Sequence, residues 1–309
     1  MGCSGPQRQP GRPHGGDAGR GKAGQDGRMD PFAHHIAACN NLPSPAGYLP
    51  FRIGEDQVGW LEPDAAKALT FLPNRVHFGP EGVSLAAGIR GSAARTGALA
   101  EIARTLARAG FGRIRGEEFD VRATPEGPVL GTVDRGVLPA LGIISQGVHV
   151  NGLVRRADGL HLWVGWRAKD KAVAPGQMDN IVAGGIPAGL TPERCLVKEA
   201  EEEASLPAEL AAKARPVGRV SYIMRTEEGM RRDLLHLYDL EIPEGIEPRP
   251  NDDEVERFEL WPIGRVLEAV RDTESVKFNV NLVLIDLFLR EGLLPDPDGA
   301  LRAGLDQLA

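Results

Sequence analysis

Cysteine is scarce in this chain of 309 residues: its three cysteines, Cys3, Cys39 and Cys195, are widely separated. Disulfide frameworks and structural zinc sites need more cysteines at closer spacing, so the sequence argues against both. So few cysteines are typical of a reducing compartment, and we expect a cytoplasmic protein. Long apolar runs are missing as well, because no stretch approaches the roughly 18 residues of a membrane span and no signal-peptide core is present.

The chain also lacks a basic surplus. Its formal net charge is −7, and the charge is unevenly distributed, because residues 1–28 carry +3 and the remaining residues carry −10. An acidic body argues against general binding to nucleic acid. If the protein acts on anionic compounds such as diphosphates, it therefore needs local basic residues and a metal ion to hold them.

The first 28 residues lack the large apolar side chains from which a core is built. They contain nine glycines and no Ile, Leu, Val, Phe, Trp or Tyr, so they are predicted to be disordered. Gly2 could carry a myristoyl group, but Pro6 stands where that signal has Ser or Thr, which argues against lipidation. Because Met29 opens a more protein-like stretch, residues 1–28 are interpreted as an upstream extension.

Residues 29–140 are predicted to form an N-terminal α+β accessory domain. No catalytic constellation is recognisable in this segment: the adjacent His34 and His35 point in different directions on a predicted helix, and Arg113 and Arg115 are interpreted as surface charge. The apolar patterns indicate strands at residues 48–53, 58–61, 76–78, 83–85, 117–121 and 129–133 and helices at residues 63–72 and 96–109.

Residues 141–292 are predicted to form a second domain, followed by a loose tail at residues 293–309. The domain opens with a hairpin, because Asp158-Gly159 is a strong turn signal between two alternating segments. The patterns that follow indicate strands at residues 149–156, 160–167, 217–225, 233–242 and 254–261 and helices at residues 263–269 and 281–290, in addition to the helix described next.

A glycine loop enters a helix between residues 181 and 206, with Thr191 as the predicted N-cap and Pro192 as the first helical residue. Helical spacing places three carboxylates, those of Glu199, Glu202 and Glu203, on one face. Hard divalent cations prefer oxygen ligands, so this face is a candidate site for Mg²⁺ or Mn²⁺. The alternative is a solvated acidic face, although like charges three or four residues apart repel one another and a cation would offset that cost.

The same segment resembles the Nudix box, whose pattern is G-x5-E-x7-R-E-U-x-E-E-x-G-U, with U an aliphatic residue. The matching residues are Gly184, Glu199, Glu202, Glu203 and Leu206. The departures are Leu190 for the first Glu, Lys198 for the Arg and Ser205 for the last Gly. Lysine keeps the positive charge, and the donor fork of arginine is less needed when its acidic neighbour is absent.

The flanking segments resemble one Nudix subgroup, whose members are similar to the Nudix domain that accompanies thiamine pyrophosphokinase. These segments are P-G-x-M-D-N-I-V-A-G-G-I-P-A-G-L from residue 175, N-D-D-E-V-E-R-F-E-L from residue 251 and K-F-N-V-N from residue 277. The subgroup carries an N-terminal accessory domain and tends to have Gly-Leu in place of the first Glu of the box. Val280 departs from it, because the subgroup usually has Pro there.

The resemblance implies an α+β fold: a Nudix α/β/α sandwich with a mixed sheet at residues 141–292, preceded by the smaller α+β accessory domain. It also implies that the three box carboxylates bind Mg²⁺ or Mn²⁺. Glu199 and Glu202 would act in catalysis together with Lys198, which would orient a carboxylate. Gly184 and Gly185 would form a tight loop at the substrate.

Other charged residues near the box are candidates for substrate binding. Arg167, Lys169 and Lys171 lie one loop upstream and could meet a diphosphate, and the alternative is a plain charged loop. Glu254 is a candidate distal ligand or base. Its rivals are Asp252, Asp253 and Glu256, and a solvated acidic turn is the alternative for all four.

The function that the resemblance implies is metal-dependent hydrolysis of thiamine diphosphate, especially its damaged oxo and oxy forms, to the monophosphate and phosphate. One alternative is a housecleaning hydrolase for other diphosphates, such as 8-oxo-dGDP or a sugar nucleotide. The other is a Nudix-like sensor that binds a ligand without cleaving it, which the retained carboxylates disfavour. Nudix proteins often pair, so a homodimer is possible, and neither nucleic acid nor membrane is expected as a partner.

Overall fold

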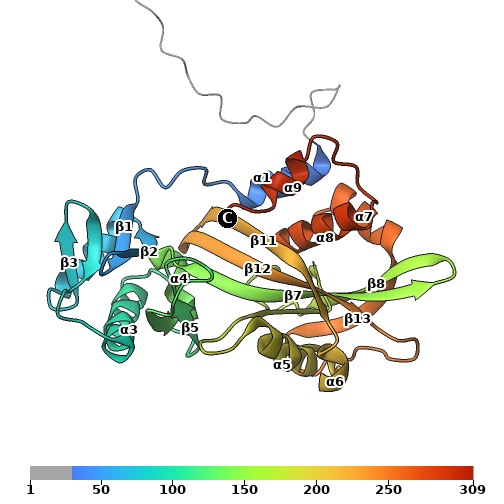
Figure 1. The fold of residues 1–309 in the computed structure, drawn as a ribbon, viewed down its shortest axis with the longest axis horizontal. Coiled ribbons are helices and arrows are strands. Elements are labelled where there is room, and N and C mark those ends of the chain that lie inside the picture. Colours follow the sequence, from blue (N-terminus) through green and yellow to red (C-terminus); the bar gives the residue numbers. More distant parts are fainter. Residues whose placement is uncertain (1–29, 309) are drawn as a thin grey trace, which may run out of the picture.

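The computed structural model describes residues 30–308 (Figure 1). The predictions for residues 1–28 and for Cys3 therefore lie outside the described residues. Within residues 30–308, no helix is long and apolar enough to cross a membrane.

A mixed sheet forms the centre of the larger domain. Its strands run in the order β11-β12-β7-β8-β13, and two short strands join it, β10 beside β7 and β9 beside β8. β12 and β7 are parallel, whereas the other pairs are antiparallel. The strands are β7 (Ile144–Arg156), β8 (Gly159–Arg167), β9 (Met178–Asp179), β10 (Val182–Gly185), β11 (Arg215–Thr226), β12 (Gly229–Glu241) and β13 (Val255–Pro262).

Helices cover both faces of this sheet (Figure 1). α5 and α6 lie on one face, and α1, α7, α8 and α9 lie on the other. Both faces are apolar because large side chains alternate along the strands: Leu237 of β12 contacts one layer and the next residue, Tyr238, contacts the other. The helices are α1 (Pro31–Cys39), α5 (Pro192–Ala204), α6 (Ala208–Ala211), α7 (Ile263–Asp272), α8 (Phe278–Arg290) and α9 (Ala300–Gly304). The predicted α/β/α sandwich with a mixed sheet is confirmed.

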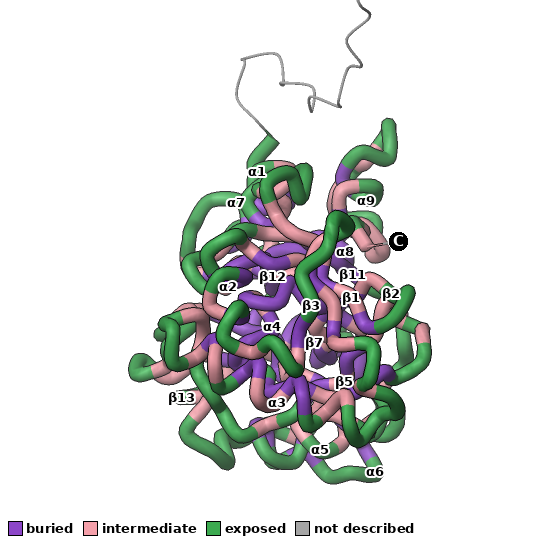
Figure 2. Tube along the Cα trace, turned by 90° about the vertical axis from the view of Figure 1, so that its left-hand side faces the viewer, coloured by how far each residue is buried: buried purple, intermediate pink, exposed green. Residues whose placement is uncertain are grey.

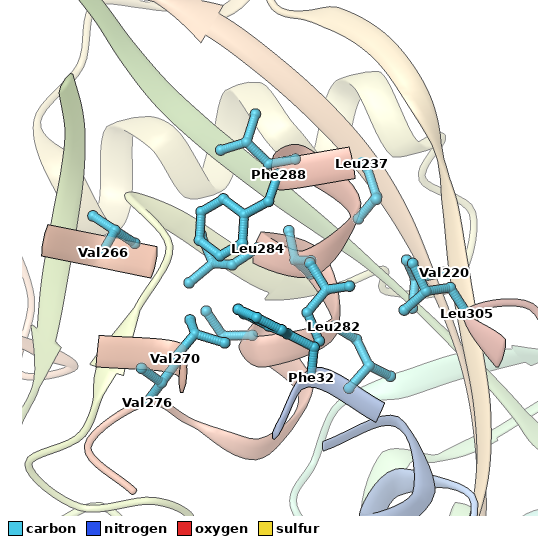
Figure 3. Packing of buried hydrophobic residues seen from close by; sticks show 14 of the residues in the cluster. Phe32, Val220, Leu237, Val266, Val270, Val276, Leu282, Leu284, Phe288 and Leu305 are labelled. Atoms are coloured by element: carbon cyan, nitrogen blue, oxygen red, sulfur yellow. The ribbon is translucent and has the colours of Figure 1, made fainter. Parts of the chain in front are cut away.

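The layer around α8 forms the larger of the two cores beside the sheet. Phe32 of α1 packs edge to face on Phe288 of α8, with ring centroids 6.4 Å apart. Leu282 and Leu284 of the same helix are buried among residues of α7 and the sheet (Figure 3). Figure 2 shows the same distribution, with buried segments along β7 and β12 and exposed segments in α5 and α6.

The two ends of the described chain lie in this layer. α1 falls within the predicted accessory domain, residues 29–140, yet it packs on α8 and α9 of the larger domain. The predicted loose tail contains α9, whose Leu301 is buried, and Leu305 beyond it accepts a backbone hydrogen bond from Ser221 of β11. Apolar side chains in both segments find partners on the same sheet face, which local patterns cannot show.

The accessory domain, defined here as the segment from β1 to α4, has its own buried core. A four-stranded sheet in the order β2-β1-β4-β3 packs with α3, and a two-stranded sheet, β5-β6, follows. The elements are β1 (Leu49–Ile53), β2 (Asp56–Leu61), α2 (Pro63–Ala68), β3 (Val76–Gly79), β4 (Gly82–Leu85), α3 (Ser92–Arg108), β5 (Glu118–Val121), β6 (Gly131–Asp134) and α4 (Leu138–Leu141). The predicted strands and helices of this segment are confirmed within a few residues.

The accessory domain packs directly on the loop that precedes α5. The backbone N–H of Ala188 donates to the carbonyl of Glu118 in β5 at 2.7 Å. The ring of Phe119 lies so close to Gly185 that a Cβ added there would sit 2.6 Å from its Cζ. This contact explains why a glycine is needed at residue 185, and it ties the two domains together at the site described next.

Candidate active site

The helix α5 begins and ends as its sequence predicts. The side chain of Thr191 accepts the backbone N–H of Arg194 at 3.4 Å, and Pro192 occupies the first helical position. Cys195 is buried against the sheet. Ser205 ends the helix in the left-handed conformation, with φ of 52°. Glycine adopts that conformation without strain, which is why the Nudix pattern has Gly at this position and why serine costs about 1 kcal/mol there.

Glu203 is the most buried of the three box carboxylates, with 7% of its surface exposed. Its Oε2 accepts the backbone N–H of Ala183 at 2.9 Å. Burial raises the pKa of Glu203 well above its usual range, and the nearby carboxylates of Asp179, Glu199 and Glu254 add to the effect despite the opposing hydrogen bond. A crowded, desolvated carboxylate of this kind favours a bound cation.

Glu199 lies directly over the glycine loop. A Cβ added to Gly184 would sit 2.5 Å from the carboxyl carbon of Glu199, so only glycine leaves room for this side chain. Burial raises the pKa of Glu199, against the hydrogen bond from Lys198. The loop and the helix carboxylate are therefore in van der Waals contact.

Glu202 is the exposed member of the trio, and Lys198 links it to Glu199. The Nζ of Lys198 donates to Glu202 at 2.6 Å and to Glu199 at 3.0 Å. These hydrogen bonds raise the pKa of the lysine although burial opposes them. Lys198 thus orients two of the carboxylates, which is the role implied for the Arg of the Nudix pattern.

The donor chemistry of this helix face fits a divalent cation of the Mg²⁺ type. Its carboxylates are hard oxygen ligands, and the half-buried Glu199 and the buried Glu203 lie beside other carboxylates, which a cation would offset. Within residues 30–308, however, no three acidic, histidine or cysteine side chains are grouped as a ligand shell. The ammonium of Lys198 instead occupies oxygens of Glu199 and Glu202, so a cation would bind in its place or beside it.

A cavity of about 270 Å³ lies on the other side of the glycine loop. Gly184 and Gly185 line it, as do Arg167, Lys171 and Glu254. Seven lysine and arginine side chains line the cavity against three acidic ones. These cations are Arg115, Arg135, Arg167, Lys171, Arg231, Arg232 and Lys277. The local basic residues that an acidic protein needs for an anionic substrate are therefore gathered in one cavity.

The residues predicted to bind substrate differ in their position relative to the cavity. Lys169 is exposed and lies outside the cavity lining, whereas Arg167 and Lys171, two residues to either side, line it. Among the four acidic candidates that follow residue 251, only Glu254 lines the cavity, and it pairs with Lys171 at 2.9 Å. Asp252 is exposed and its side chain accepts the backbone N–H of Glu254.

Asp179 was missed by sequence reasoning, although it belongs to the quoted M-D-N segment. It is buried and accepts from Arg167 and from Lys277, both at 2.9 Å. Burial opposes its ionisation, but these cations outweigh burial and lower the pKa of Asp179 to about 2. Beside it, burial and the charge of Lys277 lower the pKa of His149 to about 4, so that imidazole is neutral at pH 7. Asp179 therefore holds two of the cavity cations in place.

Comparisons with known proteins follow the same division of the chain. A family model described as the NUDIX domain matches residues 146–279, and one described as a domain of unknown function (DUF4743) matches residues 31–145. Nudix hydrolase 20, chloroplastic, from Arabidopsis thaliana is 35% identical over 282 residues, covering 87% of this chain and 75% of that protein. Nudix hydrolase 24, chloroplastic, from the same plant is 35% identical over 275 residues, with the same coverage. Among solved structures, DR0079 from Deinococcus radiodurans gives a TM-score of 0.43 at 22% identity and covers 54% of this chain and 97% of that one.

Proposed function

Because this chain belongs to the Nudix hydrolase family, we propose that it cleaves the diphosphate of thiamine diphosphate, and especially of its damaged oxo and oxy forms, to the monophosphate and phosphate with Mg²⁺ or Mn²⁺. One observation carries the hydrolytic part of the proposal. Gly184 of the glycine loop contacts the carboxylate of Glu199, and Gly184 and Gly185 both line the cation-rich cavity. A diphosphate in this cavity would lie beside the cations and the loop that contacts this carboxylate.

The chain's own residues divide the work between holding a cation and holding an anion. Glu199, Glu202 and Glu203 would bind the divalent ion, which supplies Lewis acidity that offsets charge on the phosphate oxygens. Arg167 and Lys171 would neutralise the diphosphate from the cavity wall. Because Asp179 and Glu254 already hold these two cations, their orientation is set before the substrate arrives.

The thiamine part of the proposal rests on the subgroup motifs. Lys277, Phe278 and Asn279, the first three residues of the K-F-N-V-N stretch, line the cavity, so this motif lies where a substrate would bind. A domain of unknown function also precedes the Nudix domain, in the position where the subgroup has its accessory domain. The alternatives remain another diphosphate, such as 8-oxo-dGDP, and a ligand sensor, which the three retained carboxylates disfavour.

The test is to measure phosphate and monophosphate release from thiamine diphosphate, oxythiamine diphosphate and 8-oxo-dGDP. Each is assayed with Mg²⁺, with Mn²⁺ and with EDTA. We expect turnover of the thiamine compounds that EDTA abolishes, because the carboxylates need a cation to act on an anionic substrate. Turnover of 8-oxo-dGDP alone would discard the thiamine assignment, and binding without any turnover would favour the sensor.

Gly184→Ala is expected to lower kcat about tenfold while changing the free energy of unfolding by less than about 1 kcal/mol. The new Cβ would lie 2.5 Å from the carboxyl carbon of Glu199 and 2.6 Å from its Cγ, so the Glu199 side chain has to adopt another rotamer. Steady-state kinetics and urea unfolding measure the two effects. Gly88→Ala is the matched control, because a Cβ there meets nothing within 4 Å. Unchanged kcat in Gly184→Ala would show that the contact with Glu199 has no role in the reaction.

A further inference from the structure

The accessory domain supplies part of the cavity wall. α4 and β5 lie at the ends of β7 and β12 (Figure 1), and residues from this region line the cavity opposite the strands. Two of them are arginines, Arg115 and Arg135. The cavity is therefore a shared feature of the two domains, and its charge is not supplied by the larger domain alone.

Two cavity arginines differ from the other cations in having no carboxylate partner. Arg135 pairs with Glu117, and Arg231 pairs with Asp233 at 2.9 Å. The remaining paired cations are Arg167, Lys171 and Lys277. In contrast, Arg115 of the accessory domain and Arg232 of β12 form no ion pair with any residue between 30 and 308.

The surroundings of these two arginines disfavour their charge. Burial lowers the pKa of Arg232, whose only side-chain hydrogen bond to a residue of the described chain goes to the carbonyl of Gly142 at 3.2 Å. Burial also lowers the pKa of Arg115, and the neighbouring Arg113, Arg135 and Arg231 lower it further despite the opposing charge of Glu228. An anion between the two domains would offset the desolvation of Arg232 and the repulsion of Arg115 by its neighbours.

A third residue indicates that the cavity is built for a ligand. Asn279, near the start of α8, is only 5% exposed and lines the cavity. Its Oδ1 is buried and has no hydrogen-bond partner within residues 30–308. Buried amides are normally paired, so this acceptor suits a ligand group that donates a hydrogen bond. α8 also begins at the cavity without a side-chain cap, and the backbone N–H groups of a helix start attract anions.

We propose that the accessory domain binds the substrate directly: Arg115 holds the diphosphate from the accessory-domain wall of the cavity, and Arg232 holds it from β12. This inference rests on the proposed function and adds a role for the N-terminal domain. Each guanidinium offers several N–H donors to phosphate oxygens, which favours a phosphate over a monovalent anion.

The experiment measures binding of inorganic pyrophosphate to the full chain by isothermal titration calorimetry in EDTA. Arg115→Ala and Arg232→Ala are each expected to raise the Kd about tenfold or more, the loss of one charge-assisted contact to phosphate. Arg113→Ala is the matched control. It removes the same charge two residues from Arg115, from an exposed side chain that lies outside the cavity lining, and should change the Kd less than about twofold.

Three outcomes would overturn the inference: wild-type affinity in Arg115→Ala, equal losses in Arg115→Ala and Arg113→Ala, or no binding of pyrophosphate by the wild type. Arg115 is exposed, so its alanine variant should fold. If Arg232→Ala does not fold, Arg232→Lys tests that position with the positive charge kept. Because EDTA prevents turnover, the result is independent of the hydrolysis assay. If the wild type binds pyrophosphate through Arg115 but does not hydrolyse the thiamine compounds, only the substrate assignment is overturned.

Discussion

Glu203→Gln is expected to lower kcat at least about 100-fold while leaving the folded protein as stable as the wild type or more stable. Glutamine has nearly the shape of glutamate and can still accept the N–H of Ala183, so the loop keeps its hydrogen bond. It lacks the negative charge that would bind the cation. The same charge destabilises the fold when no cation is bound, because burial and neighbouring carboxylates raise its pKa.

The pH dependence of the free energy of unfolding tests whether the charge of Glu203 destabilises the fold. A carboxyl whose folded pKa is raised destabilises the ionised protein, and this destabilisation is relieved as pH falls toward its ordinary pKa of 4.5. In EDTA, Glu203→Gln should therefore be more stable than the wild type at pH 7, and this difference should shrink as pH is lowered toward 4.5. Urea unfolding at several pH values measures this difference.

Glu201→Gln is the matched control for both measurements. Glu201 is exposed on another side of the same helix, so the same substitution should leave kcat and stability nearly unchanged. If Glu203→Gln kept full activity, the cation site would have to lie elsewhere. If it were strongly destabilised, the interpretation of Glu203 as a strained carboxylate would be wrong.

Asp179→Asn is expected to lower the free energy of unfolding by about 3 kcal/mol at pH 7. The substitution leaves Arg167 and Lys277 without their carboxylate, and the side chains of both are only 12% exposed. Unpaired buried cations are costly because they have lost water and gained no counter-charge. The lowered pKa of Asp179, about 2 against an ordinary 3.8, leads to a similar value of roughly 2.5 kcal/mol.

Urea unfolding of both proteins measures the effect of Asp179→Asn. A depressed folded pKa means that the stabilisation is present above pH 3.8 and is lost as pH falls toward 2, so the two proteins should converge in that window. Asp64→Asn is the control, because Asp64 and Lys67 form an ion pair whose side chains are 74% and 77% exposed, and such pairs contribute less than about 1 kcal/mol. Equal losses in the two variants would contradict a special role for Asp179.

In the helix α5, the local sequence predicts the arrangement of the carboxylates but not their burial. Spacing alone places Glu199, Glu202 and Glu203 on one face, and the structure has them there. Spacing does not show that Glu203 is buried and Glu202 exposed, because that depends on how the helix rolls against β10. The same limit applies at Lys169, which local sequence cannot distinguish from Lys171.

The composition of the cavity cannot be predicted from local sequence. Asp179 and Lys277 are 98 residues apart in sequence, and their ion pair exists because β9 and the segment before α8 meet. The sequence predicts Arg115 to be a surface charge, and the residue is exposed. The packing of the accessory domain nevertheless makes it part of the cavity lining. In both cases the contact that places the side chain at the cavity joins segments that are distant along the chain.

The amino-acid sequence by itself determined the elements and the chemistry of the helix face: turn signals, apolar periods and the box carboxylates are local patterns, and each depends on residues only a few positions apart. Tertiary structure alone decided what surrounds that chemistry. It placed α1 and α9 on the far face of the sheet, gathered seven cations from distant segments into one cavity and set two accessory-domain arginines among them. The physical reason is that burial and charge pairing are properties of contacts between segments, and no local pattern contains them.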